Sequence, residues 1–176
     1  MKNIARIGII AFSTVLMWSC GGDTNSQTEE ATDEVANVEG MTMVNLRDHG
    51  FEGAIYVPNE DFGAPEFERT NWGSLQIRVG DRFGMELQQE PISIEEKKAE
   101  LMDEQVYTVE FVEDTPNLLF WKKSIPDSGI DPEFQFFYLY DADGFKVEIK
   151  SFESEQFSES AVKKMIQSAK SYDHAK

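Results

Sequence analysis

One stretch limits the possible folds of this chain more than any other: SLQIRVGDRFGMELQQ, residues 74–89. Apolar and polar residues alternate on both sides of Gly80–Arg82, which is the period of a half-buried β-strand. A three-residue loop pairs Val79 with Phe83 and keeps the six alternating apolar side chains of the two arms on one face. A two-residue loop would place apolar residues opposite polar ones. The stretch therefore predicts a β-hairpin with one buried face and one wet face.

The same alternation recurs, with more aromatic residues, in EFQFFYLYDADGFKVEIKSF, residues 133–152. Asp143-Gly144 supplies the backbone freedom that a tight turn needs. We expect one apolar row on each arm, with Phe134, Phe136, Tyr138 and Tyr140 on the first, Phe145, Val147 and Ile149 on the second, and Lys146, Glu148 and Lys150 facing water. Phe137 and Leu139 make the other face of the first arm apolar too, so this arm is predicted to be a central strand covered on both sides.

A third hairpin is predicted from residues 105–124, QVYTVEFVEDTPNLLFWKKS, with Glu113–Asn117 as its connection. Pro116 lacks an amide hydrogen and suits the turn better than a ladder. Shorter strands are expected at Met43–Leu46 and Ala54–Val57. The chain should then have about eight strands.

Two helices are expected between and after these hairpins. Ser93 and Glu96 form the S-x-x-E capping box, which predicts a helix through about Met102. Ser158 or Ser160 can cap a second helix, whose apolar stripe is formed by Val162, Met165, Ile166 and Ala169. We expect an α+β fold over residues 43–176, a twisted antiparallel β-sheet built from hairpins with a middle helix and a C-terminal amphipathic helix against one face. This order of elements resembles the PsbP-like arrangement, and the resemblance concerns architecture only.

The N-terminus has the features of a secretory signal, which we assign to residues 1–19. Lys2 and Arg6 precede an uncharged apolar run over residues 7–18, and the small residue Ser19 comes before Cys20. Twelve residues are too few to span a bilayer, which takes about 20 in a helix. The end of the run resembles the lipobox of bacterial lipoproteins. That resemblance implies that Cys20 becomes the new N-terminus and carries a diacylglycerol thioether, anchoring the protein to a membrane of the bacterial cell envelope. Gly21 after the cysteine favours the outer membrane.

Residues 20–42 are predicted to be a disordered tether. The segment after Cys20 is rich in acids and contains no base and no aromatic residue, so it cannot offset the entropy of ordering. The whole chain carries 16 basic and 33 acidic residues; without Lys2 and Arg6 the balance is 14 to 33, a net charge of −19. Such a surface repels phosphate backbones, so we expect no nucleic acid as a partner. It also has no attraction for anionic lipid headgroups, so membrane anchoring should depend on the acyl chains on Cys20.

The motifs that could carry chemistry are incomplete. The DADG motif, residues 141–144, does not complete an EF-hand loop. Leu139 and Lys150 stand at loop positions where calcium binding needs acidic residues. The only histidines are His49 and His174, which are too few for an ordinary zinc site. Asp48 and His49 are interpreted as two neighbouring polar residues of a loop rather than as a catalytic pair. There is no nucleophile elbow, P-loop or dinucleotide-binding motif. We therefore predict no catalytic residue, no cofactor and no metal.

Two loops are candidate binding sites. Trp72 stands just before the first hairpin, where it is either an exposed recognition residue or part of the core edge. The Pro/Gly-rich connection of residues 123–133 carries Asp127, Asp131 and Glu133. These features suggest a non-catalytic binding or assembly module with an envelope protein as partner. The alternative is a carrier of, or enzyme for, a small apolar ligand, which would need a cavity lined by the aromatic row from Phe134 to Tyr140.

Overall fold

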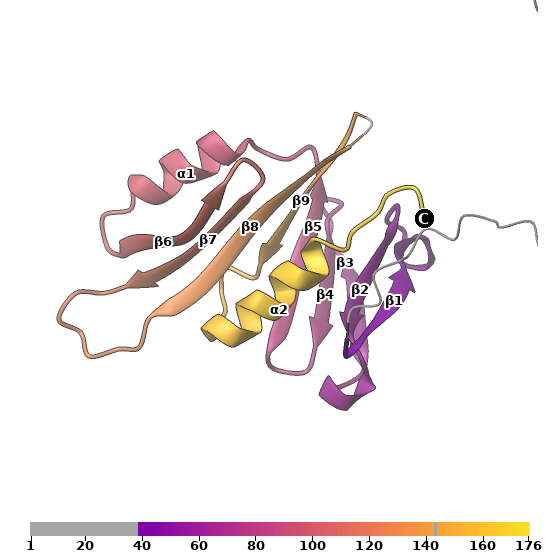
Figure 1. Ribbon diagram of the computed structural model, residues 1–176, viewed down its shortest axis with the longest axis horizontal. Coiled ribbons are helices and arrows are strands. Elements are labelled where there is room, and N and C mark those ends of the chain that lie inside the picture. Colours follow the sequence, from indigo (N-terminus) through magenta and orange to yellow (C-terminus); the bar gives the residue numbers. More distant parts are fainter. Residues whose placement is uncertain (1–38, 143) are drawn as a thin grey trace, which may run out of the picture. The chain divides into compact units, whose positions relative to one another are not determined.

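The computed structural model describes residues 39–142 and 144–176, without the side chain of Glu60. The predicted signal peptide, Cys20 and the tether up to residue 38 lie outside the described residues. The described residues form an α+β unit with nine strands, two α-helices and two short 3-10 helices (Figure 1). The strands are β1 Met41–Asn45, β2 Ala54–Pro58, β3 Pro65–Arg69, β4 Leu75–Val79, β5 Phe83–Gln89, β6 Thr108–Thr115, β7 Leu118–Ser124, β8 Glu133–Ala142 and β9 Phe145–Ser151. The helices are η1 Leu46–His49, η2 Glu60–Phe62, α1 Ile94–Met102 and α2 Glu159–Ala169.

Seven strands form one antiparallel sheet in the order β3-β4-β5-β9-β8-β7-β6, and β1 and β2 form a separate two-stranded sheet. The large sheet consists of two meanders, β3 to β5 and β6 to β9, which are joined by the pairing of β5 with β9. The connection through α1 carries the chain from β5 in the middle of the sheet to β6 at its edge (Figure 1). This topology keeps every neighbouring pair antiparallel.

The period-two patterns predict two hairpins correctly, and they also predict the register of the first. In β4 and β5, Val79 lies opposite Phe83 across the three-residue loop. In β8 and β9, Tyr138 lies opposite Ile149 and Tyr140 opposite Val147, so the two predicted apolar rows share one face. The helix α1 begins after Ser93 with the full capping box, and Ser158 rather than Ser160 caps α2.

Two predicted boundaries are wrong, and one strand is absent from the prediction. The loop between β6 and β7 is only Pro116 and Asn117, because Thr115 Oγ1 accepts a hydrogen bond of 3.1 Å from the amide of Leu118 and closes a tight turn. The strand β1 begins at Met41, so the last two residues assigned to the tether belong to the sheet. The strand β3 was missed, because PEFER has a single bulky apolar residue and a proline, which edge strands tolerate.

The main core lies between the large sheet and α2. The α2 residues Val162, Met165, Ile166 and Ala169 pack against the predicted apolar faces of β4, β5, β8 and β9. The β1–β2 hairpin joins this core beside the C-terminus, where Ala54 and Asp173 exchange two backbone hydrogen bonds of 2.9 and 3.0 Å. The C-terminal segment therefore holds the small sheet against α2.

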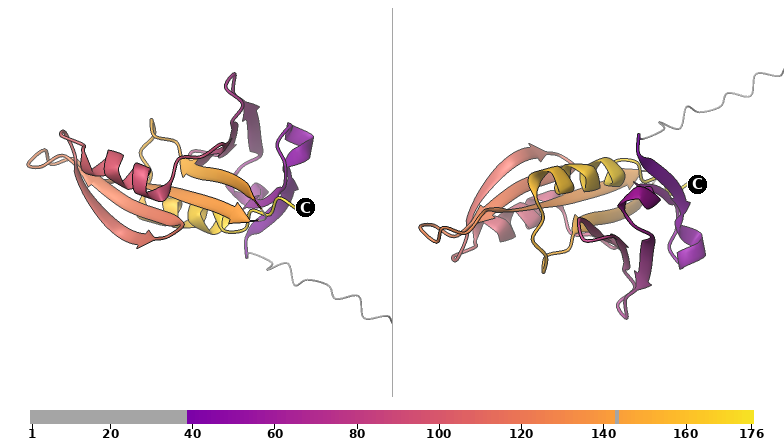
Figure 2. Two further views of the ribbon diagram at one scale, coloured as in Figure 1. Left: turned by 90° about the horizontal axis from the view of Figure 1, so that it is seen from above. Right: turned by 90° about the horizontal axis from the view of Figure 1, so that it is seen from below.

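The helix α1 covers the opposite face of the sheet, so the expectation that both helices share one face is wrong (Figure 2). A second core forms there from Ile94 and Leu101 of α1 with Leu119, Trp121 and Phe137. Because β7 and β8 carry apolar residues on both faces, each can lie between two helices, as predicted for β8. No helix among residues 39–142 and 144–176 is long and apolar enough to cross a membrane.

Candidate functional site

The helix α1 covers only half of its face of the sheet, and the open half is polar. A hollow on β3, β4, β5 and β9 runs across this half and consists of two adjoining parts of about 280 and 300 Å³. Both parts are lined by Gln76, Arg78 and Phe152. We call this hollow the polar groove; its remaining lining residues are Glu66, Phe67, Glu68, Glu86, Glu153, Ser154 and Glu155 with Lys150.

The alternating pattern of the strands creates the floor of the polar groove. Side chains that alternate with core residues must point to the other face, which places Gln76 opposite Glu86 and Glu86 opposite Lys150 across three adjacent strands. Gly84 lies two residues from Glu86 on β5, opposite Arg78, and adds no side chain there. The Phe152 ring lies against it so closely that a Cβ on Gly84 would be 2.5 Å from the ring. The glycine thus gives the groove an aromatic floor between polar side chains.

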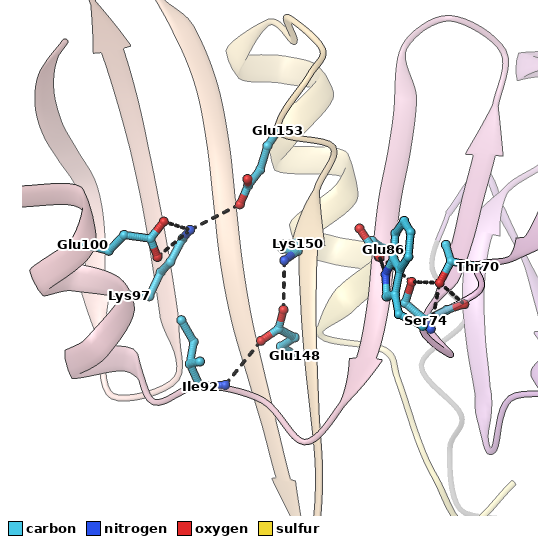
Figure 3. Close-up of polar contacts among 10 residues, drawn as sticks. Thr70, Ser74, Glu86, Ile92, Lys97, Glu100, Glu148, Lys150 and Glu153 are labelled. Atoms are coloured by element: carbon cyan, nitrogen blue, oxygen red, sulfur yellow. Dashed lines mark hydrogen bonds and ion pairs between the residues drawn. The ribbon is translucent and has the colours of Figure 1, made fainter. Parts of the chain in front are cut away.

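Trp72, which is 71% exposed, contacts the polar groove through Glu86, one of its lining residues. Its indole Nε1 donates a hydrogen bond of 3.2 Å to Glu86 Oε1, and Ser74 Oγ donates to the same carboxylate oxygen. The turn that carries Trp72 is closed by Thr70 and Ser74, which bond through backbone and hydroxyl groups, including Oγ1···Oγ at 2.7 Å (Figure 3). The tryptophan is therefore exposed and also held in place.

One charged residue next to the polar groove, the partner of Lys150, is buried more deeply than its sequence pattern indicates. Glu148 was expected to face water, but its side chain is only 5% exposed. Its carboxylate accepts from Lys150 Nζ at 3.0 Å and from the amide of Ile92 at 3.4 Å (Figure 3). The segment leading into α1 covers Glu148, which the alternation of β9 could not predict.

The wall of the groove on the α1 side is an ion-pair network. Lys97, with a side chain only 7% exposed, contacts Glu100 and Glu153 at 3.2 Å each (Figure 3). Partial burial raises the pKa of the Glu153 carboxyl, but the nearby charges of Lys97 and Lys150 outweigh it, and the pKa ends below its ordinary value. For Lys150, burial alone would lower the pKa of the ammonium group. The negative charge of Glu148 and its hydrogen bond have the larger effect, so the pKa of Lys150 lies above its ordinary value. Both shifts favour the ionised forms of Glu153 and Lys150.

A second ion pair lies on the β4 side of the groove. The Arg78 guanidinium makes two parallel contacts with Glu155, one of them at 3.0 Å, and its charge lies 5.0 Å from the centre of the Phe152 ring. This bidentate geometry fixes the planar group in one orientation. Glu66 and Glu68 stand exposed at the β3 rim of the groove.

The groove therefore presents fixed hydrogen-bonding groups rather than a reactive pair. Each carboxylate on its floor is held by a base, an amide or a hydroxyl, and each base by a carboxylate. Ser74, whose hydroxyl faces Glu86, is fully buried and cannot reach a substrate. The chemistry that this arrangement supports is recognition.

The structure separates the other predicted loop from Trp72. Asp127 and Asp131 are exposed in the connection between β7 and β8, and Glu133 begins β8 and accepts from Gln156 at 2.8 Å. Three strands lie between β7 and β4, so these acids and Trp72 belong to different regions (Figure 1). Trp72 contacts the charged lining of the polar groove through Glu86. Glu86, Glu148 and Lys150 were not predicted as site residues, although the predicted register already places Glu86 beside Gln76.

The histidines have structural contacts. The His49 ring stacks on Phe67 with centroids 3.8 Å apart, and His174 Nδ1 lies 2.8 Å from the hydroxyl of Tyr140. In the described part of the chain, no group of three or more histidine, cysteine, aspartate and glutamate side chains is placed to hold a metal ion. Of the DADG motif, Asp141 and Ala142 end β8, and Gly144 lies in the turn before β9.

A larger hollow of about 580 Å³ lies at the start of α2, beside the β4–β5 turn. Arg82 and Lys164 line it together with Asp61 and Asp81, and Lys164 Nζ lies 3.7 Å from the centre of the Phe62 ring. The hydroxyl of Ser158, which lines this hollow, already caps α2, because Ser158 Oγ accepts a hydrogen bond from the amide of Ala161. The hollow lacks the fixed aromatic residue and the ion-pair floor of the polar groove.

The aromatic row from Phe134 to Tyr140 is part of the core beneath α2. Phe136 is fully buried and Tyr138 nearly so, and both belong to the main apolar cluster. The hollows described above are lined by other residues. Comparison of the chain with protein-family models, with curated proteins and with solved structures gives no match.

Proposed function

We propose that this chain is a non-catalytic binding module of the bacterial cell envelope, tethered by acyl chains on Cys20, and that the polar groove is its binding surface. The observation that carries the proposal is the pairing of an exposed, hydrogen-bonded Trp72 with a hollow whose charged groups are held in place. An exposed tryptophan adds nothing to the core, and its fixed orientation suits it to contact a partner.

The lipid anchor follows from the lipobox-like sequence before Cys20. Stable anchoring takes more than one acyl chain, at about 0.8 kcal/mol for each buried CH₂ group, and the lipoprotein modification supplies at least two. The acidic character of the chain, a net charge of −17, provides no attraction to anionic headgroups. The proposed anchor therefore depends on the acyl chains alone, and an outer-membrane location remains part of this proposal.

The carrier alternative needs a cavity among the rings from Phe134 to Tyr140. In the described part of the chain those rings face the packed α2 interface, so no specific observation favours that function. The binding module is the function that we pursue.

The test uses a photo-crosslinking amino acid in place of Gln76 in the full chain, expressed in its native host. Gln76 lines the polar groove, and Gln167, exposed on α2, offers a matched control position. We expect a crosslinked product from position 76 and none from position 167. Equal products from both positions, or none from position 76, would refute the groove as the binding surface.

The anchor is tested separately with Cys20→Ala. We expect the wild type in the membrane fraction with an acyl mass on its N-terminal peptide, and the variant without either. A wild type that lacks the acyl mass would refute the anchor and would leave the groove proposal standing.

A further inference from the structure

We infer that the polar groove binds a saccharide chain, with Trp72 as the platform for a sugar ring and the charged floor as the partner of its hydroxyl groups. This inference rests on the proposed function of the groove and adds the chemical class of its ligand.

The first argument is the state of Trp72. A pyranose has a face of weakly polarised C–H bonds, and the electron-rich face of an indole is a suitable surface for positively polarised groups. The bond from Trp72 Nε1 to Glu86 Oε1 at 3.2 Å holds the indole ring beside Glu86, which lines the groove. The ring thus loses little conformational freedom when a sugar stacks on it.

The second argument is the mixture of donors and acceptors. A hydroxyl both donates and accepts, so a polyol is matched by a surface where the two kinds of group alternate. The groove alternates in this way, with the amide of Gln76, the carboxylate of Glu86 and the ammonium of Lys150 on adjacent strands. A hydroxyl-binding site with fixed polar partners also rejects ligands that lack the hydroxyl.

The third argument is the balance of charge. Arg78, Lys97 and Lys150 are each paired with a glutamate, so an anionic ligand would have to displace a carboxylate from its base. A cationic ligand would meet the same obstacle at Glu148, Glu153 and Glu155. Glu66 and Glu68 at the rim are exposed and can accept hydrogen bonds from sugar hydroxyls. Their negative charge also makes a basic peptide the main alternative ligand. A neutral polyol fits the paired floor best, since it leaves every ion pair intact.

The fourth argument is size. The two parts of the groove measure about 280 and 300 Å³ and share three lining residues, so they form one elongated hollow. Small-ligand sites measure roughly 300–1,000 Å³. The groove is open along its length, which suits a short stretch of a chain better than an enclosed molecule.

The test measures binding by calorimetry with the full chain in a detergent that has no sugar headgroup. The probes are the tetrasaccharides of N-acetylglucosamine, maltose-type glucose and cellulose-type glucose, with decalysine as the cationic probe. We expect at least one tetrasaccharide to bind with a dissociation constant below about 10 mM. Trp72→Ala should weaken binding at least about tenfold, and Trp72→Phe less, because it keeps an aromatic face. Phe62→Ala, which removes an exposed ring outside the groove, should leave affinity unchanged.

Binding of none of the tetrasaccharides, or equal binding by wild type and Trp72→Ala, would overturn the saccharide inference. Binding of decalysine alone would overturn it as well and would leave the groove as a site for a basic partner. The proposed function fails separately, when the crosslinking position at Gln76 gives no product.

Discussion

Glu148 and Lys150 stand two residues apart on the same face of β9, and their side chains form an ion pair of 3.0 Å beneath the segment that leads into α1. Because Glu148 is only 5% exposed, removing Lys150 leaves a buried carboxylate without its ion-pair partner. We predict that Lys150→Met lowers the free energy of unfolding by about 2–4 kcal/mol, measured by chemical denaturation. Lys146→Met, which breaks the exposed pair with Asp141, should cost less than about 1 kcal/mol. Equal costs would contradict the account of the buried pair.

The lowered pKa of Glu153 predicts a pH dependence of stability. A carboxyl whose pKa is lower in the folded state stabilises the fold above its ordinary pKa, and that contribution is lost as the pH falls through the lowered value. Wild type should therefore be more stable than Glu153→Gln at neutral pH, and the difference should shrink below a pH of about 4.5. Repeating the comparison in a Lys97→Met background should reduce the pH effect. A difference that does not vary between pH 7 and pH 3 would rule out this coupling.

Gly84 should tolerate no side chain, because its Cβ would lie 2.5 Å from the buried Phe152 ring. We predict that Gly84→Ala destabilises the domain by about 1–3 kcal/mol in chemical denaturation. Phe152→Leu provides the matched background, since a smaller side chain at this position leaves room for the methyl group. The double variant should lose less stability than the sum of the two single variants, and strict additivity would show that the ring does not limit position 84.

The Ser93 capping box is expected to control the stability of α1 locally. Ser93 Oγ accepts from the amide of Glu96 at 3.1 Å, and Glu96 accepts from the amide of Ser93 at 2.8 Å. Ser93→Ala should cost about 1 kcal/mol and should speed amide exchange within α1. Ser158→Ala removes the corresponding cap of α2 and should affect that helix instead. Unchanged exchange in α1 of the Ser93 variant would contradict the local role.

The sequence predicts the hairpins well because period-two alternation fixes both the face of each residue and the register. This reasoning places Gln76, Arg78 and Glu86 together on one wet face. It cannot show what covers a face, since a covering segment belongs to another part of the chain. For that reason Glu148 was expected in water, and α1 was expected on the same side as α2.

The polar groove could be anticipated only in part. The contact between Trp72 and Glu86 joins residues 14 positions apart and depends on the conformation of a turn, which the alternation does not determine. The loop with Asp127 and Asp131 has the composition of a binding loop, but its place in the fold depends on the order of the strands. Strand order follows from the pairing of β5 with β9, for which the sequence offers no local signal.

The most direct test of the central claim, that the polar groove beside Trp72 is a saccharide-binding surface, is a nuclear magnetic resonance titration of the indole N–H groups. The chain has three tryptophans, and Trp18 belongs to the predicted signal peptide. The mature protein then keeps only Trp72, beside the groove, and Trp121, which is 2% exposed beneath α1. We predict that a binding tetrasaccharide shifts the Trp72 indole signal and leaves the Trp121 signal in place, as an internal control. A shift of both signals, or of Trp121 alone, would contradict the claim.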